Sequence, residues 1–62
     1  MNEEKLNDAY GILFADMFEL ANKEELSWWD KQRILGLEIS FEVFKEYAKI
    51  KNFKLVEPEY EL

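Results

Sequence analysis

The sequence contains no cysteine, no histidine and no threonine, and it has only one proline and two glycines among its 62 residues. Without cysteine no disulfide can stabilise the chain, and without cysteine and histidine a structural zinc site is excluded. A chain of this length buries only about 60% of its unfolded surface when it folds. We therefore expect its stability alone to be marginal, and oligomerisation to supply the additional core.

Side chains suited to catalysis are scarce as well. Nucleophilic catalysis needs a hydroxyl or thiol beside a base, and the chain offers only Ser27 and Ser40 without any histidine. Glu38 and Glu42 stand four residues apart, but the lysines Lys45 and Lys49 share their helix face, which favours a solvated surface over an acid–base or metal site. No phosphate-binding, calcium-binding or dinucleotide motif is present. The sequence thus predicts no enzyme, no cofactor and no metal.

The charge balance is acidic, with 8 basic against 14 acidic residues and a net charge of −6. This balance argues against direct binding of nucleic acids or anionic membranes, which need clustered lysine and arginine. The longest run free of charged or strongly polar residues, Ala9 to Ala15, is far shorter than the roughly 20 residues that cross a bilayer. The first residues lack the features of a signal peptide. We expect a cytoplasmic protein with no membrane partner.

Two apolar rows with helical spacing lie between Ser27 and Asn52. At about 100° per residue, one row falls on a single side of a helix. It holds Ile34, Leu37, Phe41, Phe44 and Ala48. A second row lies on another side and holds Leu35, Ile39, Val43, Tyr47 and Ile50. A helix with two apolar faces cannot be covered by one neighbour, so the second row predicts a further contact.

Local signals define the ends of this helix, which we predict over residues 28–51. Ser27 and Asp30 form a capping pair, and Asn52 suits the left-handed conformation that ends a helix. Residues 37–43 also alternate between apolar and polar, which is typical of a strand. The helix is favoured because no turn residue separates this segment from the helical row that follows.

Residues 2–23 form the first predicted helix, with Asn2 as its cap and Ile12 as the only apolar residue near its polar side. The turn over 23–27 is short enough to make the two helices antiparallel. Pro58 ends any further helix, so residues 53–62 form an extended tail whose first apolar residues are expected to fold back on the hairpin. The tail could act as a short docking peptide with Tyr60 and Leu62 as its anchors, although a frayed end is favoured. We predict one all-α domain over 1–62, an antiparallel helical hairpin that pairs into a four-helix bundle.

These features indicate a small acidic protein-interaction or regulatory module that binds itself, with a dimer favoured, and another protein. The expected interface comprises Trp28, Trp29, Leu35, Ile39, Val43, Tyr47 and Ile50. The two tryptophans have two interpretations: they seal the end of the core, which is favoured, or at least one is an exposed anchor for a partner.

Two alternative functions stay open. One is an acidic inhibitor of a DNA- or RNA-binding protein, such as a phage or mobile-element protein, whose carboxylates imitate nucleic-acid phosphates. Its recognition surface would comprise Glu24, Glu25, Glu57, Glu59 and Glu61. The other is a small subunit that folds only within a larger complex.

Overall fold

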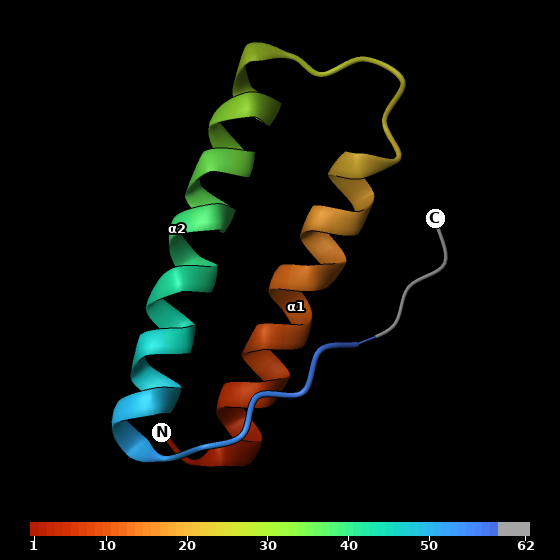
Figure 1. The fold of residues 1–62 in the computed structure, drawn as a ribbon. Helices are drawn as coiled ribbons and strands as arrows, with labels where there is room; N and C mark the ends of the chain where they lie inside the picture. The colour runs from red at the N-terminus through yellow and green to blue at the C-terminus, as the bar shows by residue number, and fades with distance from the viewer. Residues whose placement is uncertain (59–62) are drawn as a thin grey trace.

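The chain folds into two antiparallel α-helices with an extended tail, and the computed structural model describes residues 1–58 (Figure 1). Helix α1 spans Glu3–Ala21 and α2 spans Trp28–Lys51. The tail crosses the open end of the hairpin and returns alongside α1 (Figure 1). The predicted all-α helical hairpin is confirmed, and the strand interpretation of residues 37–43 is wrong because these residues lie inside α2.

Asparagine residues stand at three of the four helix ends. The Asn2 side chain accepts a hydrogen bond from the backbone N–H of Lys5, as expected of a cap. Helix α1 ends two residues earlier than predicted because Asn22 caps it: its side-chain amide donates to the Phe18 carbonyl over 2.8 Å. Helix α2 has the predicted limits, and Asn52 has the left-handed backbone conformation, with φ of 58°.

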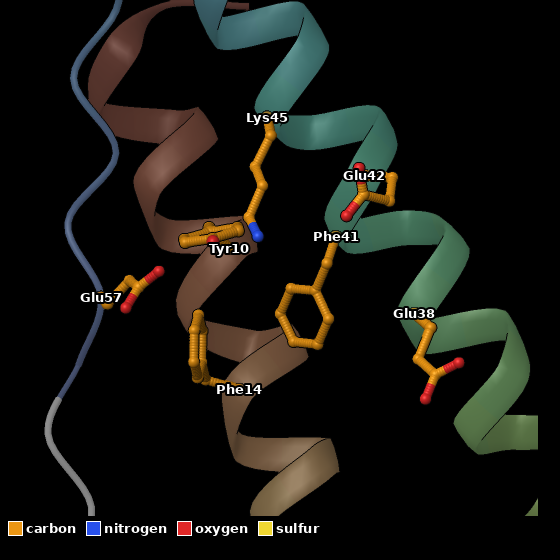
Figure 2. A pocket seen from close by; sticks show the side chains of 7 residues that line it. All are labelled: Tyr10, Phe14, Glu38, Phe41, Glu42, Lys45 and Glu57. Atoms are coloured by element: carbon orange, nitrogen blue, oxygen red, sulfur yellow. The ribbon is translucent and has the colours of Figure 1, made fainter.

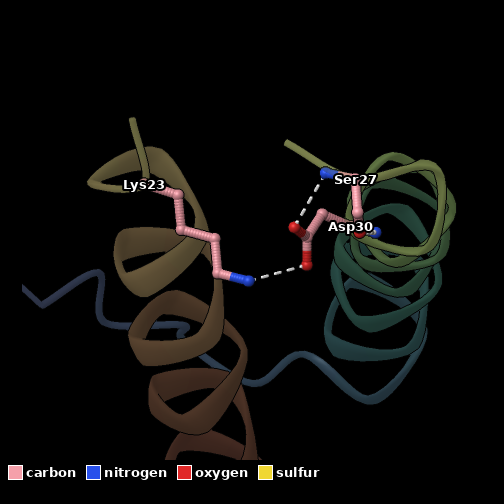
Figure 3. A network of polar contacts seen from close by, with 3 residues as sticks. All are labelled: Lys23, Ser27 and Asp30. Atoms are coloured by element: carbon pink, nitrogen blue, oxygen red, sulfur yellow. Dashed lines mark hydrogen bonds and ion pairs between the residues drawn. The ribbon is translucent and has the colours of Figure 1, made fainter. Parts of the chain in front are cut away.

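A polar cluster joins the end of α1 to the start of α2 (Figure 3). Asp30 accepts a hydrogen bond from the backbone N–H of Ser27 and donates its own N–H to the Ser27 hydroxyl, which is the predicted capping box. The other carboxylate oxygen of Asp30 pairs with the Lys23 ammonium at 2.9 Å. The hydrogen bond from Lys23, followed by that from the Ser27 backbone, lowers the pKa of Asp30 below its ordinary 3.8.

This lowered pKa predicts a loss of stability in acid. The unfolded chain takes up the Asp30 proton at a higher pH than the folded chain, so the stabilisation is present above the ordinary pKa and is lost as the pH falls through the folded pKa. Between pH 7 and about pH 2, the free energy of unfolding should therefore fall less in Asp30→Asn than in the wild type. Urea unfolding followed by circular dichroism measures both slopes. Equal slopes would show that the Lys23–Asp30 pair contributes nothing.

The core lies between the two helices and is rich in aromatic rings. From α1 it contains the buried Leu6, Tyr10 and Leu20, and from α2 the first predicted row, with Leu37 and Ala48 buried and Ile34, Phe41 and Phe44 half-buried. The Tyr10 ring has its centroid 5.1 Å from Phe14, 5.7 Å from Phe41 and 6.1 Å from Phe44. The first row of α2 therefore faces α1.

Hydrogen bonds from α1 hold the tail in place. The Asn7 side-chain amide donates to the Lys54 carbonyl over 2.9 Å, and its oxygen accepts the Val56 backbone N–H over 2.7 Å. The Lys54 N–H donates to the Glu3 carboxylate. Leu55 and Phe53 are half-buried, as expected of a tail that folds back, but Val56 is exposed. The predicted anchors at positions 60 and 62 lie outside the described residues.

Replacing Asn7 with alanine should release the tail while leaving the hairpin folded. Two hydrogen bonds to the tail would be lost, each with a net value of about 1 kcal/mol, so amide hydrogen exchange at Val56 should accelerate roughly 30-fold. Asn22→Ala is the control, since Asn22 bonds only within α1. Unchanged exchange at Val56 in Asn7→Ala would show that other contacts fix the tail.

Candidate interaction surface

An apolar stripe runs along the outward face of α2. Leu35, Ile39, Val43 and Ile50 are exposed, with Ile39 at 66% and Ile50 at 77% of full exposure. At about 100° per residue, these four side chains and Trp28 all lie within about 40° of Ile39 around the helix. We call these five residues the outer stripe. The structure therefore leaves most of the second predicted row uncovered by its own chain.

Tyr47, which belongs to the same predicted row, differs from its neighbours because it is half-buried. The ring of Phe53 lies 6.4 Å from its ring, and the Lys51 ammonium lies 5.9 Å from its centroid. The first residue of the tail thus covers one side of the stripe near the C-terminal end of α2.

The two tryptophans do not seal the core, and the favoured interpretation of them is wrong. Trp28 is 62% exposed and Trp29 73% exposed, and the two indoles pack edge to face with centroids 4.7 Å apart. Near the turn, the buried residue is Leu20, and the Lys23–Asp30 pair spans the helix ends. Trp28 instead extends the outer stripe to the first turn of α2, and Trp29 stands beside it.

Two shallow hollows border the outer stripe on either side of Val43 and Tyr47. One has a volume of about 150 Å³ and is lined by Met1, Leu6 and Phe44 in addition to these two residues. The other, of about 390 Å³, is bordered by Ile50 and by two glutamates of α2. Ridges beside hollows are what one helix needs to receive the side chains of another.

A third depression, which we call the aromatic groove, lies between α1, α2 and the tail (Figure 2). It has a volume of about 480 Å³ and is lined by Tyr10, Phe14, Glu38, Phe41, Glu42, Lys45 and Glu57. Burial, followed by the nearby Glu57 and Glu42 carboxylates, raises the pKa of the Tyr10 hydroxyl.

Sequence reasoning missed this groove. The sequence predicts that Glu38 and Glu42 stand on a solvated charged face, and both are exposed. The tail, however, places Glu57 opposite them, across the Phe14 and Phe41 rings (Figure 2). Only the i, i+4 glutamate pair beside Phe41 was visible in the sequence, because the other walls come from distant segments.

The predicted acidic recognition residues do not form one surface in the part of the chain that the structure describes. Glu24 and Glu25 are exposed in the connection between the helices, whereas Glu57 lies on the tail beside the aromatic groove. Positions 59 and 61 fall outside the described residues. Within residues 1–58, no cluster of histidine, cysteine, aspartate and glutamate could hold a metal ion, and neither helix is long and apolar enough to span a bilayer.

Comparisons with family models, curated proteins and solved structures found no match to this chain.

Proposed function

We propose that the chain is a protein-interaction module that works as a homodimer, in which two hairpins pair through their outer stripes into a four-helix bundle. One observation carries this proposal: five large apolar side chains on one face of α2, interrupted by Gln32 and Glu46, are exposed from the first turn of the helix to its last. Monomeric proteins rarely leave a long contiguous apolar surface in water. The dimer would cover this surface and supply the second half of a core that is small in one chain.

The size of α2 is sufficient for a stable contact. Its 24 residues make a helix about 36 Å long, and two such helices packed side by side, with flanking contacts from α1 and the tail, can approach the roughly 1,200–2,000 Å² of a specific interface. In a two-fold arrangement each ridge formed by Val43 would enter a hollow beside the partner's stripe. Self-association thus uses the ridges and the hollows of the same surface.

Trp29 offers a place for the second partner. It lies beside the outer stripe rather than within it, at about 80° from Ile39 around the helix, so a dimer formed through the stripe need not cover it. Tryptophan is enriched among the residues that dominate binding energy at protein interfaces. In this proposal the dimer presents two such indoles to another protein and acts as an adaptor or regulator.

Salt dependence separates this function from that of a nucleic-acid mimic. Two chains that each carry a net charge of −6 repel one another, so added salt should strengthen a dimer held by apolar contacts. A carboxylate surface bound to a basic protein would lose affinity under the same conditions. The separation of Glu24 and Glu25 from Glu57 favours the dimer, because imitation of a phosphate backbone requires a continuous acidic surface.

The solution mass of the purified chain tests the proposal. Light scattering should give twice the 7.5 kDa of one chain, and circular dichroism at the same concentration should show a helical protein. On dilution the dimer should dissociate, and tryptophan emission should shift to longer wavelength as Trp28 becomes exposed. A helical monomer at all concentrations would contradict self-association. A monomer without helices would instead indicate a subunit that folds only within a larger complex.

A further inference from the structure

The aromatic groove combines an apolar floor with an acidic rim. Phe14 and Phe41 are half-buried, their ring centroids are 4.9 Å apart, and both line the groove. Glu38 and Glu42 stand on one side and Glu57 on the other (Figure 2). Aromatic faces attract cations, and more strongly where water is partly excluded. The floor and the rim therefore favour the same kind of ligand.

Tyr10 provides an independent indication that a ligand belongs there. The residue is only 1% exposed, yet its hydroxyl forms no hydrogen bond with any group of residues 1–58. No fully enclosed polar side-chain atom of this part of the chain lacks a hydrogen-bond partner, so the Tyr10 hydroxyl must keep a small opening to solvent. Because Tyr10 lines the groove, we assign this opening to the groove. The hydroxyl is thus a buried polar group available to a bound ligand.

The charges around the groove are unbalanced. It contains three carboxylates and one ammonium, that of Lys45, which extends from α2 toward Tyr10 (Figure 2). The only ion pair within residues 1–58 joins Lys23 to Asp30, so Lys45 is bonded to none of the three glutamates. The groove therefore has a net negative charge, and its carboxylates are free to accept hydrogen bonds.

We infer that the aromatic groove, with its free Tyr10 hydroxyl and three unpaired carboxylates, is a binding site for an arginine side chain of a partner protein. The planar guanidinium can stack on Phe14 or Phe41 and donate in several directions at once. The acceptors stand on opposite sides of the groove, which suits such a fork of donors better than the compact ammonium of lysine. The groove contains no residue of the outer stripe, although Glu42 also borders the larger hollow beside that stripe.

Titration of the isotope-labelled full chain, followed by NMR, tests this site with three capped amino acids. N-acetyl-arginine amide should produce saturable shifts at the amides of Phe14, Phe41 and Glu57. The citrulline analogue has nearly the same shape without the charge and should bind at least about tenfold more weakly. The lysine analogue should bind about threefold more weakly than arginine. Equal shifts with arginine and citrulline, or tighter binding of lysine, would overturn the assignment.

Single substitutions around the aromatic groove test whether arginine binds there. Glu38→Gln, Glu42→Gln and Glu57→Gln should each weaken arginine binding by about threefold, whereas the same change at the distant Glu24 or Glu25 should not. Lys45→Met should strengthen binding by a similar factor, because it removes the competing ammonium. If these exposed residues were only structural, the glutamate variants would not weaken arginine binding while Lys45→Met strengthens it. Equal weakening by Glu24→Gln and Glu42→Gln would mean that arginine senses only the net charge, and would refute the site.

Discussion

Replacing Ile39 with glutamate is expected to convert the dimer into a folded monomer. Ile39 lies at the middle of the outer stripe and is 66% exposed in the single chain, so the substitution costs the hairpin little. In a two-fold dimer it would remove two buried isoleucines and enclose two carboxylates, a penalty of at least about 3–4 kcal/mol. The dissociation constant should therefore rise by roughly 100-fold to 1,000-fold.

Light scattering over a range of protein concentrations measures this effect, with circular dichroism to show that the helices persist. The matched control is Ile12→Glu, because Ile12 is exposed to nearly the same extent, 63%, but stands on α1 away from the outer stripe. The control should keep the mass of the dimer. If both variants dissociate, the added charge rather than the position is responsible. If Ile39→Glu remains dimeric, the stripe is not the dimer interface.

The features that could be predicted from the sequence are those that neighbouring residues determine. Ser27 and Asp30 are three positions apart, and their capping box forms as expected. Asn52 ends α2 because it adopts a backbone conformation that few other residues tolerate. The two rows of α2 follow from its 3.6-residue period, and the structure buries or half-buries every residue of one row while exposing most of the other.

The path of the tail could not be predicted, because it depends on partners far apart in the chain. Asn7 binds the backbone of Lys54 and Val56, which are 47 and 49 positions away. An asparagine on a helix surface gives no sign of such a role. The aromatic groove was missed for the same reason, since Glu57 reaches Phe14 only after the tail has docked.

The exposure of the tryptophans was predictable in part. Trp28 stands seven residues before Leu35, so helical spacing alone places it on the outer stripe. The interpretation as a core seal relied on residue type, since large aromatic side chains are usually buried. The exposure of Trp28 follows from its position on the helix and not from its residue type. An exposed tryptophan that continues an exposed apolar row is consistent with a surface used for binding, as the proposed dimer requires.

Replacing Tyr10 with alanine should unfold the hairpin. Tyr10 is almost fully buried and contacts the rings of Phe14, Phe41 and Phe44, so it links α1 to α2 at the centre of the aromatic core. Removing a large buried aromatic side chain typically costs about 3–5 kcal/mol. At about 0.05–0.15 kcal/mol per residue, a chain of 62 residues has a total stability of roughly 3–9 kcal/mol. The expected loss of stability is therefore comparable to the total stability of the chain.

Tyr10→Phe separates the ring from its hydroxyl. This variant keeps the ring contacts, and the hydroxyl forms no hydrogen bond within residues 1–58, so its free energy of unfolding should stay within about 1 kcal/mol of the wild type. Urea unfolding at one fixed protein concentration compares the three chains, because dimerisation would make stability depend on concentration. A helical Tyr10→Ala chain with the wild-type midpoint would show that apolar contacts outside the aromatic core hold the two helices together.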